Sequence, residues 1–248
     1  MFFNRGAPKK GKKIIENLFF FHETQMLDCN QYIIKNDQKD ELVIFDAGNG
    51  LSLDGLIDGM KKLNLSYEDI TSVYLTHEHV DHVVGIYPLL EKMENDPPTI
   101  FAFGETAKII REGDQSKIIP GNLGISPKMF GINIKPLDVV ELDLENPVKI
   151  GNDFSFKIYH TPGHSLGSIT YYEPNLKILI PGDLVFTGGS FGRYDFPGGS
   201  LKKLQESIEY VNNLDVTHLL PGHMGVSNKG NEQIKHSNRM VHSVGGFF

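Results

Sequence analysis

Six consecutive residues of this 248-residue chain include three histidines and an aspartate, all of which can bind a metal ion. The segment is His77-Glu78-His79-Val80-Asp81-His82, and it follows an apolar run over 70–75 that is typical of a buried strand. In an extended stretch, side chains two positions apart project to one side, so His77 and His79 are placed to bind one ion together. Asp81 and His82 follow where the chain turns, where a second ion can reach them. Imidazole and carboxylate suit zinc, and also iron or manganese.

Three further polar residues each follow an apolar run at a turn that contains Gly and Pro. They are His164 after Pro162-Gly163, Asp183 after Pro181-Gly182, and His223 after Pro221-Gly222. Glycine permits the tight backbone conformation that directs the next side chain at a cleft. With the first cluster they make seven candidate ligands, which is enough for two metal ions.

The elements that must position these ligands fall into two comparable halves, each with several strands followed by a helix. This order predicts an α/β fold of four layers, in which two mixed sheets face each other and helices cover the outside. We predict a single domain over 1–248, with a basic leader at 1–15 and a lid or insertion at 103–136, where Gly, Pro and Asn crowd. Strands are predicted at 16–27, 31–35, 42–45, 70–75, 139–142, 148–150, 154–160, 168–172, 177–180 and 217–220, and helices at 51–63 (capped by Ser52), 83–93, 105–112 and 201–214.

Composition limits the classes of function. The net charge of −7 argues against a nucleic-acid partner, and we interpret the basic cluster of Arg5 and four lysines between 9 and 13 as a solvated leader. Cys29 is the only cysteine, which excludes a disulfide scaffold. The apolar run 18–21 is far shorter than the roughly 20 residues of a membrane span. We therefore expect a soluble cytoplasmic enzyme with no membrane partner, and Phe247 and Phe248 favour contact with a second copy of the chain.

The motif His77-x-His79-x-Asp81-His82, followed in order by the three later ligands, resembles the metallo-β-lactamase superfamily. The resemblance implies an αβ/βα sandwich with two divalent cations, zinc first, at one edge. A hydroxide shared by the cations would attack a carbonyl, and Asp81 and Asp183 would be the catalytic carboxylates. By position in the motif, the first cation would be held by His77, His79 and His164, and the second by Asp81, His82 and His223, with Asp183 bridging both.

The segment 187–200 narrows the resemblance to glyoxalase II-like thioesterases and persulfide dioxygenases, which have an Arg-x-Asp pair at the place of Arg193 and Asp195. We expect this pair to support the ligands from behind. Tyr194 and Phe130 are the candidates for contacts with the substrate, which we expect to be a small acyl-thiol or ester. Glyoxalase II enzymes bind glutathione with a C-terminal extension, and only 25 residues follow His223 here, so a different acyl-thiol or a broad range of esters is favoured.

Four alternatives compete with thioester hydrolysis. A persulfide dioxygenase would use one iron held by His77, His164 and Asp183, and a lactonase would use the same activated water. A serine hydrolase triad of Ser165, Asp183 and His223 requires a helix directly after the serine, where the sequence predicts a strand. A non-enzymatic module would bind metal without turnover.

Overall fold

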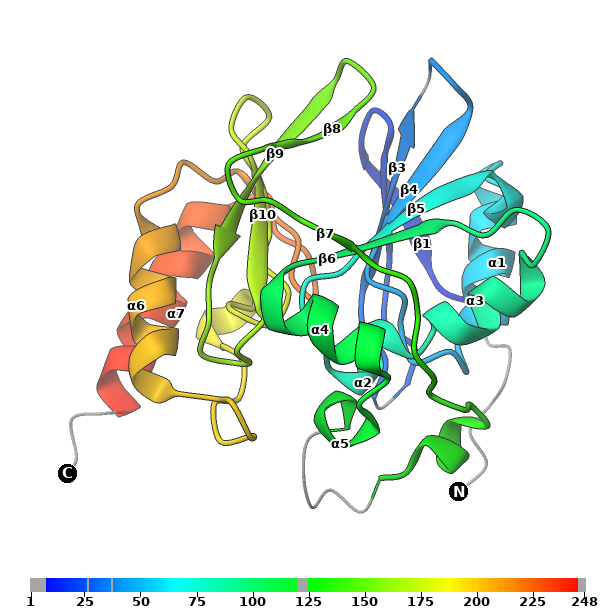
Figure 1. The fold of residues 1–248 in the computed structure, drawn as a ribbon. Coiled ribbons are helices and arrows are strands. Elements are labelled where there is room, and N and C mark those ends of the chain that lie inside the picture. Colours follow the sequence, from blue (N-terminus) through cyan, green and yellow to red (C-terminus); the bar gives the residue numbers. More distant parts are fainter. Residues whose placement is uncertain (1–7, 26, 37, 120–124, 245–248) are drawn as a thin grey trace. The chain divides into compact units, whose positions relative to one another are not determined.

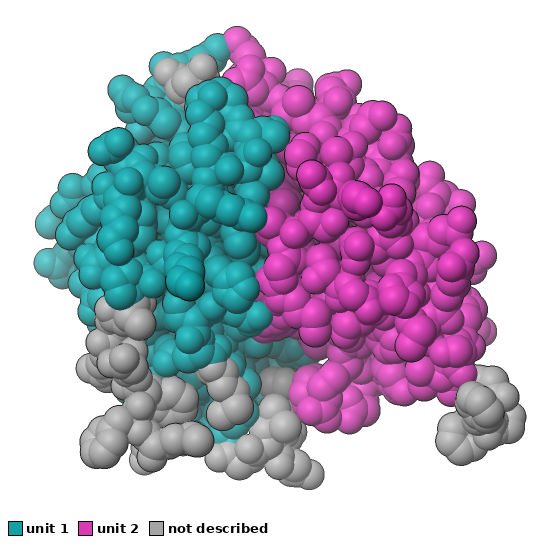
Figure 2. Space-filling model, turned by 180° about the vertical axis from the view of Figure 1, so that it is seen from behind, with its two compact units in different colours: residues 1–141 teal, residues 142–248 magenta. Residues whose placement is uncertain are grey.

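The computed structural model describes residues 8–25, 27–36, 38–119 and 125–244. The chain divides into two compact units, residues 1–141 and residues 142–248, which Figure 2 colours teal and magenta. Arg5, Phe247 and Phe248 lie outside the described residues, as do parts of the predicted leader and lid. Within the described residues, every helix is too short or too polar to cross a bilayer.

The first unit is built on a seven-stranded mixed sheet in which the strands lie in sequence order (Figure 1). The first four strands pair antiparallel, and the last four pair parallel. Parallel strands end at one edge of a sheet, so the loops after β4 and β5 start side by side. The strands are β1 (Gly11–Ile15), β2 (Leu18–Phe21), β3 (Gln31–Asn36), β4 (Glu41–Phe45), β5 (Ile70–Tyr74), β6 (Thr99–Ala102) and β7 (Val140–Glu141).

The helices of the first unit pack on this sheet through one apolar cluster. Helix α1 has its apolar residues at helical spacing, and Leu53, Leu56, Ile57 and Met60 are all buried. Burying each such side chain stabilises the unit by about 1.5–3 kcal/mol. The helices are α1 (Leu53–Lys62), α2 (Val80–Val83), α3 (Ile86–Lys92), α4 (Gly104–Glu112) and α5 (Gln115–Ile118), with the 3-10 turns η1 (Tyr67–Asp69) and η2 (Pro127–Phe130).

The second unit has a five-stranded sheet in the order β12-β11-β10-β9-β8, antiparallel except for the β11–β12 pair. Helices α6 and α7 lie side by side in Figure 1, and their apolar residues join those of the sheet in one cluster. Two mixed sheets, each flanked by its own helices, confirm the predicted fold class. The elements are β8 (Val148–Ile150), β9 (Phe154–His160), β10 (Ile169–Glu173), β11 (Ile178–Ile180), β12 (His218–Leu219), η3 (Thr187–Gly189), α6 (Leu201–Asn212) and α7 (Gly230–Val244).

Several local expectations differ from the structure. Of the basic segment's described residues, Lys10, Lys12 and Lys13 are exposed, as expected of a solvated segment, but strand β1 begins at Gly11 and Lys9 is 1% exposed. The helix predicted for 83–93 is broken at Gly85, where an added Cβ would lie 1.9 Å from the oxygen of Ala47. Ser52 precedes α1 as predicted, but its hydroxyl makes no cap and donates to Asp28 instead. Strand β6 and helix α7 were not predicted.

The predicted lid contains the helices α4 and α5 and the turn η2. Ile109, Ile110, Ile118 and Phe130 are buried in the apolar cluster of the first unit. This part of the chain therefore contributes to the core, and its role as a lid stays a prediction.

Candidate metal centre

In the first unit the histidine motif begins where β5 ends. The extended residues after Tyr74 bring the rings of His77 and His79 to a centroid distance of 4.8 Å, nearly perpendicular to each other. Helix α2 then starts at Val80, and its turn places the ring of His82 4.1 Å from that of His77. The three imidazoles are buried, whereas Asp81 is partly exposed. His77 and His79 thus lie between β5 and α2, and the turn of α2 carries Asp81 and His82.

Asp46, at the end of β4, holds the histidine motif from behind. Its carboxylate accepts bonds from the main-chain N–H and the hydroxyl of Thr76, both at 2.8 Å, and it lies 2.8 Å from Nδ1 of His82. The hydroxyl of Thr76 also lies 3.0 Å from Nδ1 of His77. With Nδ1 engaged in this way, each of these two rings is left with Nε2 as its metal-binding atom. Asp46 is 3% exposed, so its charge acts in a weakly screened environment.

A second buried carboxylate anchors the loop that carries Asp46. Asp28 pairs with Lys9 at 2.9 Å, and both side chains are 0% exposed. The ammonium also donates to the main-chain oxygen of Cys29, and Asp28 accepts from the hydroxyl of Ser52 at 2.8 Å. Ser52 is the last residue of the loop 46–52. The Lys9–Asp28 pair therefore connects Lys9 to the loop that begins with Asp46.

Cys29 lies beside this network and is fully buried. Its thiol, the carboxylate of Asp46 and His82 each offer an atom within 4.8 Å of the others. Burial is the main effect on the thiol and raises the pKa of Cys29. Nδ1 of His82 already contacts Asp46 at 2.8 Å, and we interpret the buried Cys29 as a packing residue.

In the second unit, two candidate histidine ligands approach one carboxylate oxygen of the third candidate, Asp183. Nε2 of His164 lies 3.5 Å and Nε2 of His223 lies 3.2 Å from Oδ2 of Asp183. His164 follows β9, Asp183 follows β11 and His223 follows β12, at the turns that the sequence singled out. Asp183 is 8% exposed, and His223 is more open than His164. The ring of His223 also packs edge-on against Phe186 at 5.7 Å.

The support behind His164 differs from the one that the sequence predicts. Nδ1 of His164 lies 2.6 Å from the main-chain oxygen of Arg193, so it is the backbone of this residue that reaches the ligand. The guanidinium turns outward and makes a bidentate pair with Asp195, at 2.9 and 2.7 Å. This pair raises the pKa of Arg193 and lowers the pKa of Asp195. Arg193 and Asp195 thus lie at the site, with the contact to the ligand made by a carbonyl.

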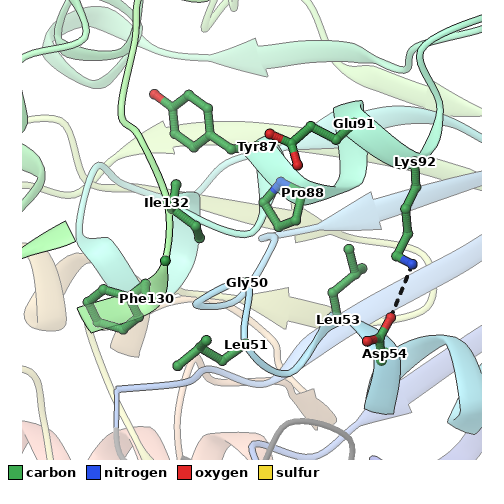
Figure 3. Close-up of a pocket in the computed structure, with 11 residues that line it drawn as sticks. Gly50, Leu51, Leu53, Asp54, Tyr87, Pro88, Glu91, Lys92, Phe130 and Ile132 are labelled. Atoms are coloured by element: carbon green, nitrogen blue, oxygen red, sulfur yellow. Dashed lines mark ion pairs between the residues drawn. The ribbon is translucent and has the colours of Figure 1, made fainter. Parts of the chain in front are cut away.

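The two candidate substrate residues have different surroundings. Phe130 lines a cavity of about 220 Å³ in the first unit, together with Leu51, Pro88 and Ile132 (Figure 3). Tyr194 is partly buried against the apolar cluster of the second unit. Their contact with a substrate stays a prediction.

The serine hydrolase alternative is excluded by the local structure. Strand β10 begins at Ile169, so the helix that a nucleophilic Ser165 requires is missing. The hydroxyl of Ser165 is buried and lies 2.9 Å from that of Ser168.

Sequence reasoning missed Asp46, Thr76, Asp28 and Lys9. Asp46 had a usable signal, since it directly follows an apolar strand and precedes the turn that contains Gly48. Lys9 had none, because a lysine within a basic cluster has the pattern of a solvated residue.

Both ligand sets fit a divalent cation. They combine imidazole nitrogens with carboxylate oxygen, which is the donor set that zinc and iron accept. In each set the Nδ1 atoms of supported rings are held by an oxygen acceptor, as is usual for metal-binding histidines. Residues 25–223 match a family described as the metallo-beta-lactamase superfamily. The chain belongs to this superfamily. Its members are metal-dependent hydrolases, and we therefore describe the chain as a metallo-hydrolase.

Three similar proteins show the range within the superfamily. A hydroxyacylglutathione hydrolase, GloC of Haemophilus influenzae, is 30% identical over 194 residues, which is 77% of this chain and 79% of that protein. The crystal structure of the BLEG-1 B3 metallo-beta-lactamase is 28% identical with a TM-score of 0.64. The crystal structure of TTHA1623 in a di-iron-bound form is 26% identical with the same TM-score. Each of the two structures aligns with 85% of this chain and 94% of its own.

Proposed function

We propose that this metallo-hydrolase cleaves thioesters of small acyl-thiols at a centre of two divalent cations, with zinc as the first choice of metal. The observation that carries the proposal is the presence of two imidazole–carboxylate sets with supported rings, at the ends of strands in both halves of the sequence. The similarity to a hydroxyacylglutathione hydrolase supports a thioester in particular.

We assign the ligands by their place in the family motif. His77, His79 and His164 would hold one cation, Asp81, His82 and His223 the other, and Asp183 both. Residues 1–248 would then act as one catalytic domain to which each unit contributes a ligand set. Family membership supports this joining of the two sets.

In this hydrolysis the cations, Asp183 and Asp81 have different roles. When bound, the two cations supply Lewis-acid activation of a water molecule and of the substrate carbonyl. Asp183 keeps Nε2 of His164 and of His223 directed at one point. Asp81, with its partly exposed carboxylate, accepts the proton of the attacking water and returns it to the departing thiolate. Water and thioester thus give a carboxylic acid and a thiol.

The test is a hydrolysis screen over thioesters, lactones, persulfides and a β-lactam with protein whose metal content is quantified. We expect thioesters to give the highest kcat/KM, with two metal equivalents per chain. Turnover of none of these substrates by metal-loaded protein would contradict the proposal, and full activity of metal-free protein would contradict the metal centre.

Asp183→Ala is the sharpest variant for the same screen. Because one oxygen of Asp183 faces both imidazoles, we expect kcat/KM to fall roughly 1,000-fold and metal content to fall with it. Full activity with unchanged metal stoichiometry would show that Asp183 is not a ligand. His82→Ala is the companion variant, and we expect it to remove mainly one metal equivalent.

The second candidate function is persulfide oxygenation at iron. The di-iron-bound relative is the observation that favours iron chemistry for this scaffold. Oxygen uptake in the presence of a persulfide, measured on iron-loaded protein, separates this activity from hydrolysis.

A further inference from the structure

The loop of residues 191–199 contacts His164 through its backbone. Nδ1 of His164 lies 2.6 Å from the main-chain oxygen of Arg193, and only Nδ1–H can donate to a carbonyl. Nδ1 therefore carries a proton, which leaves Nε2, 3.5 Å from Oδ2 of Asp183, as the ring atom that could bind a cation. The position of one carbonyl oxygen thus decides which nitrogen of His164 is able to bind a cation.

Side chains of the loop fix that carbonyl in place. The guanidinium of Arg193 is bound by both oxygens of Asp195, and it also lies over the ring of Phe196 at 4.3 Å. The ring of Phe196 in turn approaches that of His164 edge-on at 6.4 Å. Three of four consecutive residues, 193 to 196, therefore hold one another and the ligand.

The backbone of the loop also lies close to Asp183, another of the candidate ligands. At Gly192 an added Cβ would lie 1.9 Å from the main-chain oxygen of Asp183 and 3.0 Å from Nδ1 of His164. The loop continues to Ser200, whose N–H donates to the oxygen of Gly163, next to His164. The loop therefore contacts both His164 and the residue before it.

We propose that Arg193 and Asp195 are positioning residues that act as a clamp, holding the Arg193 carbonyl on Nδ1 of His164 and so presenting Nε2 to the metal. This inference rests on the proposed metal centre for the use of Nε2, and on the contacts within the second unit for the clamp itself. Arg193 and Asp195 touch neither the metal nor the substrate in this role.

Two variants loosen the clamp without removing a ligand. Asp195→Asn removes the charge that holds the guanidinium, and Arg193→Lys keeps the positive charge but loses the bidentate geometry and the stacking on Phe196. Both side chains are more than half exposed, at 59% and 58%, so the variants are expected to fold. The matched control is Asp215→Asn, which breaks another exposed pair of the second unit, with Lys177.

The first measurement is the tautomer of His164 in metal-free protein. Nitrogen-15 NMR at a pH of about 8, where a free imidazole is neutral, reports which ring nitrogen carries the proton. The His164 signal is identified by its loss in His164→Gln. We expect a single Nδ1–H form in the wild type and in Asp215→Asn, and a mixture of tautomers in both clamp variants. The same single form in the clamp variants would overturn the proposal.

The second measurement is zinc affinity, obtained by competition with a chromophoric chelator on the full chain. Partners that orient a ligand change metal affinity 10- to 100-fold. We expect about tenfold weaker binding in both clamp variants and unchanged binding in Asp215→Asn. Equal affinity in all four proteins would overturn the clamp and leave the metal centre intact. A wild type that binds no zinc would instead overturn the metal centre, while the tautomer measurement still decides on the clamp.

Discussion

In the first unit, Nδ1 of His82 faces the carboxylate of Asp46, whereas in the second unit, Nδ1 of His164 faces the main-chain carbonyl of Arg193. The charges behind these acceptors also differ. Asp46 and the Lys9–Asp28 pair are buried, while Arg193 and Asp195 are more than half exposed. The same task, fixing an imidazole ring, is done with buried charge on one side and with backbone and surface charge on the other.

The difference has energetic consequences. A buried charge that loses its partner destabilises the fold strongly, because water cannot replace the partner. An exposed pair is screened, so its loss changes stability little. Loss of the buried charges that hold His82 is therefore expected to destabilise the fold. Loss of the exposed pair behind His164 is expected to change the orientation of that ligand and to change stability little. The following variants test this comparison.

Lys9→Met is expected to have the largest effect on stability. Methionine keeps much of the stem but leaves Asp28 buried and negative, which costs about 3–5 kcal/mol of unfolding free energy. Thermal or urea unfolding measures it. Lys13→Met, which breaks an exposed pair with Glu16, is the matched control and is expected to be near wild type. The double variant Lys9→Met/Asp28→Leu should recover much of the loss. Equal stability of Lys9→Met and Lys13→Met would contradict a structural role for the buried pair.

Asp46→Asn is expected to have the next largest effect. One oxygen that accepts from Thr76 or His82 becomes an amide donor, which costs about 2–3 kcal/mol and weakens zinc binding roughly 10- to 100-fold. The backbone at Asp46 has a φ of 59°, which asparagine tolerates. Asp40→Asn is the control, because Asp40 also has a positive φ, of 52°, but pairs with Lys35 at the surface. The same zinc affinity in both variants would remove Asp46 from the support of His82.

Gly192→Ala tests the backbone support of the second unit. The added methyl group meets the oxygen of Asp183, so the loop must shift, and overpacking of this kind costs about 1–3 kcal/mol. We expect weaker zinc binding, because both His164 and Asp183 lie against this point. Gly225→Ala is the control, since a Cβ there meets no atom within 4 Å. Zinc titration of both variants checks the expectation, and no difference between them would show that the loop adapts freely.

Much of the fold could be predicted from the sequence where a single segment carries its own signal. The strands 148–150 and 154–160 match β8 and β9 because their apolar residues alternate and polar turns bound them. The candidate ligands were identifiable for the same reason, since the first four follow the apolar run 70–75 and the three later ones each follow an apolar run at a Gly and Pro turn. The supports were not, because they depend on pairs far apart in the chain, such as Asp46 with Thr76 and Lys9 with Asp28.

Residue 193 shows a second reason why the supports of the ligands could not be predicted from the sequence. An Arg-x-Asp pair near a ligand predicts side chains behind the ligand, and the structure has the backbone there instead. Every residue has a carbonyl, so sequence contains no mark of which one is used. Only the loop geometry, set by Gly192 and by the pairing of the two side chains, decides it.

Asp195→Asn is expected to have the smallest effect on stability, even though it weakens metal binding. The Asp195 carboxylate is solvated, so we expect the Tm at neutral pH to stay within about 2 °C of the wild type. Arg193 lowers the pKa of Asp195, so the small stabilisation exists above the ordinary pKa of about 4 and is lost as the pH falls through the lowered value. The two proteins should therefore become equally stable in acid. Unfolding curves from neutral pH to about pH 3 measure this, and a loss as large as that of Lys9→Met would show that the exposed clamp, like the buried pair, is coupled to folding.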